Sequence, residues 1–247
     1  MSHIKLGLRL LSEIEDGFLH DHSGDFLLGC TSPDIRAITK VERHKTHFAP
    51  LAIDKIGTGT KTLFSSNPEL PFESGNGSVT RAFLAGYINH LTVDESWIIH
   101  IYQPYFGNRV LFPDNVEANL YDRAVQLDLE RSAKGDSETM NQAVRDIYNS
   151  GNEVQIDFIN KGDLDNWKDW IAKYSNAEFS WNRLQFMMQR MYGIDDNNDS
   201  MVTRFIDEMP TSLEYVYTKV PIVKIEQFKE ATVFESLKLI KEYLNAS

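Results

Sequence analysis

Apolar residues recur at steps of three and four along most of this 247-residue chain, and this periodicity restricts it to a helical fold. In residues 3–15, for example, Ile4, Leu8 and Leu11 would line one face of a helix. Similar patterns predict helices over residues 78–99, 114–131, 137–149, 163–174, 177–192, 199–208 and 225–244. We therefore expect an all-α fold.

Three stretches depart from the helical pattern. The segment from His20 to Asp25 is polar and is typical of a loop, and the apolar run after it ends at a turn, Thr31-Ser-Pro-Asp. Glycine and proline are frequent in residues 49–77, which favours a long loop with room for one short element. Residues 212–223 are the only strand-like candidate, although Pro221 weakens that interpretation.

A chain of this length fits one domain, since single domains commonly reach about 250 residues. We interpret residues 1–247 as a single all-helical domain, with a metal-site half at about 1–131 and a helical extension at about 137–247. The single Cys30 excludes an internal disulfide, and Lys5 and Arg9 interrupt the apolar residues near the start, unlike a secretory signal. These features favour a cytoplasmic protein without a transmembrane segment, and they leave the oligomeric state open.

The net charge of −11 is unevenly distributed. Residues 1–110 hold ten Lys/Arg against twelve Asp/Glu, whereas the remainder holds fifteen against twenty-four. An acidic protein repels a polyanion, so no stable nucleic-acid complex is expected. Four basic residues nevertheless gather within ten positions, and they are either a solvated face or a rim that attracts anions: Arg36, Lys40, Arg43 and Lys45.

Histidine is confined to the first hundred residues, where all seven occur: His3, His20, His22, His44, His47, His90 and His100. Imidazoles and carboxylates are the usual zinc ligands, and a catalytic site takes three or four of them from separate elements. His90 and Asp94 are four apart and would share one face of a helix, which suits a common ion but also an ordinary solvated pair.

Each of the other candidate ligands also has an interpretation that involves no metal. Asp34 follows Ser32-Pro33, where a carboxylate either points into a site or closes an Asx-type turn. His44 and His47 are three apart and would serve either as ligands or as a polar helix face. His100 follows Asp94 by six residues, about 600° around an unbroken helix, and so would point away from the first pair.

Taken together, these residues resemble the zinc-dependent phospholipase C family, whose all-helical fold is shared with zinc nucleases that act on single strands. The shared pattern is a histidine opening the first helix, an aspartate in a turn, a histidine before an aromatic residue, and then His-x3-Asp-x5-His. Here these positions are His3, Asp34, His47 before Phe48, and His90-x3-Asp94-x5-His100.

The resemblance implies a zinc site of one to three ions, although another divalent metal would also suit these ligands. Asp34, His47, His90 and Asp94 would hold one ion, His3 and Asp94 would contribute to a second, and His100 to a third. The implied reaction is hydrolysis of a small-molecule or lipid phosphodiester by metal-activated water. Asp34 would also accept a proton as the catalytic base, and Arg36 or Lys40 would hold the substrate phosphate.

One departure from the family pattern concerns the third ion, which requires a further His-x3-Glu or His-x3-Asp. No histidine follows His100, and Asp114, Glu117 and Asp122 are the all-oxygen substitutes we consider. Two other hypotheses therefore stay open. One is a non-catalytic helical protein in which a remnant metal site braces the fold and the acidic half binds a partner. The other is a metal enzyme of the same fold that acts on a non-phosphate substrate.

Overall fold

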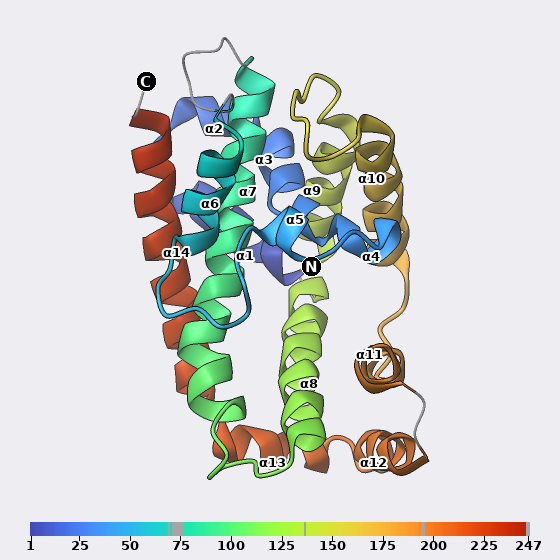
Figure 1. Cartoon of the computed structure of the whole chain (residues 1–247). Coiled ribbons are helices and arrows are strands. Elements are labelled where there is room, and N and C mark those ends of the chain that lie inside the picture. Colours follow the sequence, from blue (N-terminus) through green and yellow to red (C-terminus); the bar gives the residue numbers. More distant parts are fainter. Residues whose placement is uncertain (69, 71–76, 136, 194–195, 246–247) are drawn as a thin grey trace.

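The computed structural model describes residues 1–68, 70, 77–135, 137–193 and 196–245, and every regular element within them is a helix (Figure 1). The all-α expectation is therefore confirmed. The elements are α1 (Ser2–Glu13), α2 (Gly17–Asp21), α3 (Ser23–Gly29), η1 (Ser32–Ile35), α4 (Arg36–Thr39), α5 (His44–His47), α6 (Thr58–Ser66), α7 (Ser78–Trp97), η3 (Ile98–Phe106), α8 (Asn115–Lys134), α9 (Ser137–Asn149), α10 (Lys161–Asn176), α11 (Arg183–Tyr192), α12 (Asp196–Asp207), α13 (Thr211–Lys219) and α14 (Ile222–Asn245).

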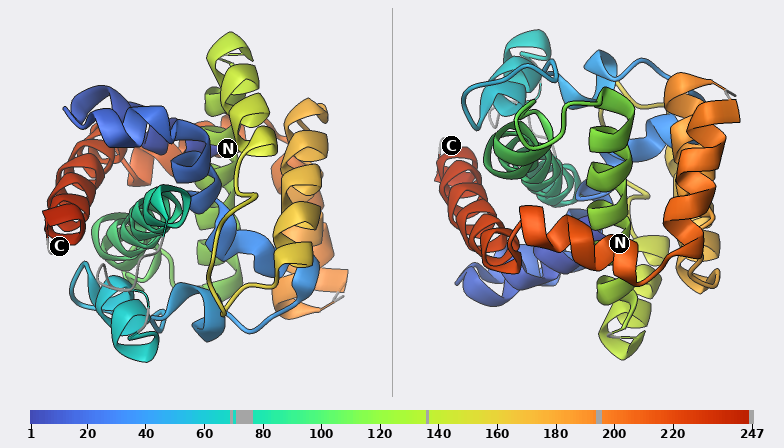
Figure 2. Two further views of the ribbon diagram at one scale, coloured as in Figure 1. Left: turned by 90° about the horizontal axis from the view of Figure 1, so that it is seen from above. Right: turned by 90° about the horizontal axis from the view of Figure 1, so that it is seen from below.

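The two longest helix runs form a frame for the rest of the molecule. α7 continues into η3, and α14 packs beside it in the opposite direction (Figures 1 and 2). α8 rises on the other side of α7 in the view of Figure 1, and α11 and α12 lie beyond it. Short helices, among them α4 and α5, cross the front of this frame. Of these short segments, η1 and α5 lie against α7, whereas α4 lies on the side of α10 (Figure 1).

Two glycines allow α3 and α7 to pack closely. A Cβ atom added at Gly29 would overlap the backbone at Phe83, and one added at Gly86 would overlap the backbone at Phe26. Only glycine permits backbones to approach this closely, so the packing of α3 on α7 requires glycine at both positions. The close approach places the residue that follows α3, Cys30, against the buried face of α7.

Most buried apolar side chains of the described residues belong to two large clusters, and α7 contributes to both. Ala49, Ile53 and Ile98 form a small third cluster. The first contains Phe26, Phe83 and Tyr87, together with side chains from α1, α9, α10 and α14. The second contains Val93 and Trp97, together with side chains from η3, α8, α11, α12 and α13. His90 and Asp94 therefore occupy the stretch of α7 where one apolar cluster gives way to the other.

The strand-like interpretation of residues 212–223 is wrong, because this stretch forms α13 and the start of α14. Leu213, Val216 and Val220 are buried at steps of three and four, which is a helical spacing. The β-branched and aromatic residues that suggested a strand are accommodated because packing outweighs local propensity. Pro221 lies in the short break between the two helices rather than in an edge strand.

Two further expectations are corrected. The polar segment from His20 to Asp25 is mostly helical rather than a loop, and the Asp16 side chain caps α2 by accepting from the Phe18 and Leu19 amides. The helix that contains His90 was predicted to end at residue 99, but it continues as a π-helix to Phe106, through Pro104. Among the described residues, no helix is both long enough and apolar enough to cross a bilayer.

Candidate metal centre

Five predicted ligands from four elements converge in front of the middle of α7. They are His3 on α1, Asp34 in η1, His47 on α5, and His90 and Asp94 on α7. The i, i+4 spacing of the last two places them on one face of α7, as expected for a helix. Pro33 occupies the first turn of η1 and helps to fix the short helix that carries Asp34.

The carboxylate of Asp94 lies at the centre of the cluster. Its Oδ1 is 3.6 Å from His3 Nε2, and its Oδ2 is 3.3 Å from His47 Nε2. The same His47 nitrogen lies 3.7 Å from Asp34 Oδ1. Arg43 adds an ion pair at 3.0 Å between its Nη2 and Asp94 Oδ2. The aspartates therefore link His3 and His47 into one network.

His90 is fully buried, and only one of its two ring nitrogens forms a hydrogen bond within the described residues. Its Nδ1 donates to the backbone oxygen of Cys30 at 2.8 Å, which fixes the tautomer and leaves Nε2 as an acceptor. Nε2 is buried without a hydrogen-bond partner among the described residues, and so is Nδ1 of His3. The His3 and His90 rings stack with centroids 3.9 Å apart. Two buried, unpaired imidazole nitrogens at one place indicate that a ligand belongs there.

A chain of contacts positions His47. Its Nδ1 lies 2.9 Å from Thr46 Oγ1, and the Thr46 backbone oxygen accepts from the Tyr87 hydroxyl of α7. Phe48, which follows, has φ 54° in the left-handed region and ends α5, and its ring packs against Phe158. With Nδ1 bonded to Thr46, the Nε2 of His47 faces both aspartates. Such outer contacts orient ligand histidines in metal sites.

The cluster has a buried floor and an open edge. The side chain of His47 is 3% exposed, whereas that of Asp34 is 50% exposed. Asp94 and His3 are intermediate in exposure. A substrate or water molecule can therefore reach the ligands from the Asp34 side, while the histidines keep the opposite side closed.

The electrostatic environment favours the neutral forms of His3 and His47 and the ionised forms of the two aspartates. Burial, followed by repulsion from His90, lowers the pKa of His3 to about 3, and burial also lowers the pKa of His47. Burial opposes ionisation of Asp94, but its hydrogen bond to His47 and the nearby His90 hold its pKa well below the usual value. The pKa of Asp34 is likewise lowered, by His90 and His3 against the effect of burial. Neutral imidazoles and ionised carboxylates are the forms that bind metal.

The residues present fit a divalent metal such as zinc. Two sets of three residues have ligand atoms that all lie within 4.8 Å of one another, namely His3, His90 and Asp94, and Asp34, His47 and His90. Their donors are imidazole nitrogens and carboxylate oxygens, which suit zinc. His90 has one free nitrogen and belongs to both sets, so it can serve only one ion at a time.

Several sequence candidates lie outside this cluster. His100 is exposed on η3 and belongs to neither set. Asp114 caps α8, Glu117 accepts from the Tyr121 hydroxyl, and buried Asp122 bonds Trp97 and Gln126. Of the other histidines, His44 is 70% exposed, while His20 bonds the Ile14 backbone and His22 pairs with Asp25. The described residues therefore bring together no third set of ligands around His100.

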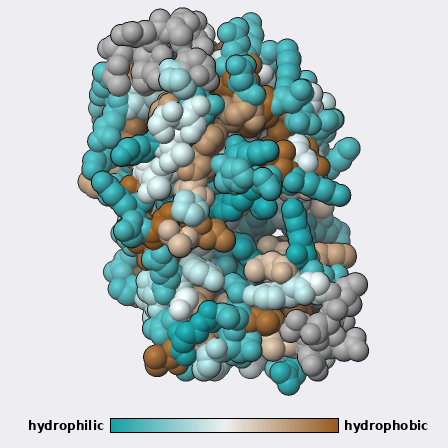
Figure 3. Space-filling view, viewed as in Figure 1, coloured by the Kyte–Doolittle hydropathy of each residue, from teal (hydrophilic) through white to brown (hydrophobic). Residues whose placement is uncertain are grey.

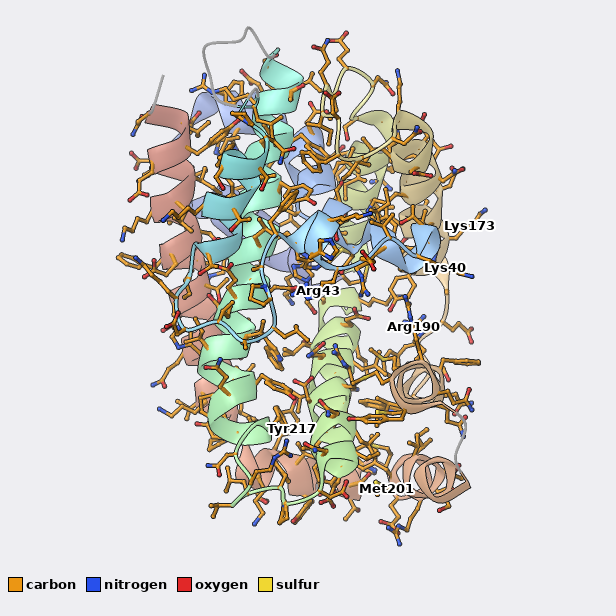
Figure 4. The ribbon with its side chains drawn as sticks, viewed as in Figure 1. Lys40, Arg43, Lys173, Arg190, Met201 and Tyr217 are labelled. Carbon is orange, nitrogen blue, oxygen red and sulfur yellow. The ribbon has the colours of Figure 1, made fainter. Side chains whose placement is uncertain are left out.

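The basic residues near the cluster differ in position. Arg36 is half-buried on α4, and its Nε is buried without a hydrogen-bond partner. Lys40 is exposed and lies at the outer end of α4 (Figure 4). Sequence reasoning grouped Arg43 with these residues but did not foresee its contact with Asp94. The roles of Thr46 and of the Cys30 carbonyl were not predicted either. Every residue has a backbone oxygen, so the residue type at position 30 does not indicate a contact with His90.

Comparison with known proteins adds one match. A family model described as zinc dependent phospholipase C matches residues 2–181. That range includes all five clustered ligands and stops just before α11. No curated protein and no solved structure matches the chain.

Proposed function

The chain belongs to the zinc-dependent phospholipase C family, and from this premise we propose that it is a zinc-dependent hydrolase that cleaves a phosphodiester. One observation carries the proposal. Three histidines and two aspartates meet at one open-edged site, where His90 Nε2 is buried without a protein partner. A cluster built only to stabilise the fold would pair its buried nitrogens.

The five proposed ligands would be shared between two zinc ions. Asp34, His47, His90 and Asp94 would hold one zinc ion, and His3 together with the shared Asp94 would hold a second. Zinc, when bound, lowers the pKa of a coordinated water to about 7 and neutralises charge on phosphoryl oxygens.

The protein's own groups supply the remaining functions. Asp34 is ionised and half-exposed, so its free oxygen would accept the proton of the attacking water as general base. Arg36 lies two residues further on with an unpaired Nε, and it would hold the phosphate of the substrate. Lys40 is further from the cluster along α4, so we assign it no more than a place at the rim. A lipid or other small phosphodiester fits a site that opens on one side only.

The test is hydrolysis of p-nitrophenyl phosphorylcholine and bis(p-nitrophenyl) phosphate by the zinc-loaded protein. We expect His90→Ala and Asp94→Ala each to lower kcat/KM by at least about 1000-fold, a loss of roughly 4 kcal/mol of transition-state stabilisation. His44→Ala, which changes an exposed histidine three residues from His47, is the matched control and should retain the wild-type rate. Full activity in both ligand variants would reject the proposal. Zinc-bound wild type that hydrolyses no phosphodiester would support a structural metal site instead.

A further inference from the structure

Arginines with unused hydrogen-bond donors gather on the open side of the metal centre. Arg43 uses one N–H on Asp94 at 3.0 Å, which leaves the rest of its guanidinium free. Arg36 has a buried Nε without a hydrogen-bond partner. Arg190 comes from α11, more than 140 residues further along the chain, and points from that helix towards α4 (Figure 4). We name Arg36, Arg43 and Arg190 the arginine cluster.

The arginine cluster lies around a hollow in the surface. The space-filling view shows the face hollowed between α4 and α5 above, α8 beside and α11 below, with hydrophilic side chains at its edge (Figure 3). The pKa of Arg36 is lowered by burial and then by repulsion from Arg190 and Arg43, which agrees with their proximity. Arginines from α4, from the turn before α5 and from α11 therefore lie around a space that is open to solvent.

The carboxylates near the arginine cluster are Asp34, close to Arg36, and Asp94, and both are proposed zinc ligands. Among the described residues, neither Arg36 nor Arg190 makes an ion pair, and Asp94, the partner of Arg43, is a proposed zinc ligand. Arg123 of α8 also raises the local positive charge, but its guanidinium already bonds Gln126 at 2.7 Å. The whole chain carries a net charge of −11, so acidic residues to neutralise these arginines are plentiful elsewhere. Like charges held close together repel one another, and a bound anion would relieve that repulsion.

We propose that Arg43 and Arg190 of the arginine cluster bind a second anionic group of the substrate, beside the scissile phosphate that Arg36 would hold. The preferred substrate is then a phosphodiester whose headgroup carries a further phosphate or carboxylate. This inference rests on the proposed hydrolase function. Guanidinium groups suit such a role because their planar donors match phosphate and carboxylate oxygens in pairs. Arg190 lies beyond residue 181, where the family match ends, so α11 would add a specificity element outside the matched part of the chain.

Two substrates that differ by one phosphate test the proposal. They are short-chain, soluble phosphatidylinositol with and without a 4-phosphate. We expect wild type to favour the phosphorylated substrate in kcat/KM, and Arg190→Gln to reduce that preference about tenfold. Arg204→Gln removes the same charge from an exposed position on the neighbouring α12 and should leave the preference unchanged. Arg190 is itself exposed, so its replacement should not unfold the protein, and thermal melting checks this.

A second measurement separates this inference from the hydrolase function. Equilibrium dialysis of radiolabelled sulfate against metal-free protein needs no catalysis, and we expect binding to weaken about fivefold or more in Arg190→Gln but not in Arg204→Gln. Equal sulfate binding by the two variants would overturn the proposal. Weakened sulfate binding with an unchanged substrate preference would overturn the substrate class, because the cluster would then hold a free anion. Weakened sulfate binding in a protein without any hydrolytic activity would reject the enzyme function and retain the anion site.

Discussion

Two buried polar groups lie along α7, and they differ in whether their hydrogen bonds are satisfied. In the first, Asp122 accepts from Trp97 Nε1 and from Gln126 Nε2, each at 2.9 Å. In the second, the metal centre, one buried nitrogen of His3 and one of His90 have no hydrogen-bond partner among the described residues. Because buried polar atoms in folded proteins are almost always paired, the first group is complete as a structural element and the second requires a ligand.

This difference bears on the number of metal ions. Asp122 was one of the oxygen ligands considered as substitutes for the histidine that the chain lacks after His100. Both of its oxygens are already engaged with α7 and α8 side chains, and burial raises its pKa, which opposes ionisation. We therefore propose that the region near α8 is a structural network and that metal binds only at the His3–Asp94 side.

Metal removal should distinguish the two groups most strongly. At free zinc about 1000 times the dissociation constant, binding stabilises the folded state by roughly 4 kcal/mol. We expect chelation to lower the free energy of unfolding of wild type by about this amount in urea titrations. The same treatment of His90→Ala should change nothing. Equal stability of wild type with and without chelator would contradict the assignment.

Asp122→Ala should show the opposite behaviour. It leaves the buried Trp97 donor unpaired and removes an acceptor from the half-buried Gln126, which should lower the free energy of unfolding by about 3 kcal/mol. Zinc content should stay at the wild-type value. Asp169→Ala, at an exposed position on α10, is the control and should be nearly neutral. Loss of zinc in Asp122→Ala would show that the two groups are not separate.

The orienting contact to His47 predicts a smaller effect. Thr46→Val keeps the shape of the side chain but removes the hydroxyl next to His47 Nδ1, so zinc affinity should fall about tenfold in chelator competition. Thr60→Val is a matched control, because Thr60 is buried and its hydroxyl has no hydrogen-bond partner. If both variants bind zinc equally, Thr46 does not orient the ligand.

The smallest effect is expected at His100. Its side chain is exposed on η3 and lies outside both ligand sets, so His100→Ala should retain zinc content and kcat/KM within about twofold. The family resemblance assigned it to a third ion. A variant that loses one equivalent of zinc would restore that assignment and weaken the contrast between the two polar groups.

The candidate site was more accessible to sequence reasoning than its surroundings. His90 and Asp94 were predictable because helical spacing is local, and Asp34 because Pro33 marks a turn. The Cys30 carbonyl and Arg190 were not, since their positions depend on how α3 packs against α7 and α11 against α8. Residues 212–223 were misread for a related reason. Their local composition suits a strand, but the burial of Leu213, Val216 and Val220 is set by tertiary packing.

We propose that the unpaired nitrogens of His3 and His90 mark a metal site, and the zinc content of the protein tests this assignment. Elemental analysis should be made on protein purified without a histidine tag, in parallel with His90→Ala. We predict one to two equivalents of zinc in wild type, as the proposed ligands imply, and a clear loss in the variant. Folded wild type that contains no metal and gains no stability from added zinc would show that these residues do not form a metal site.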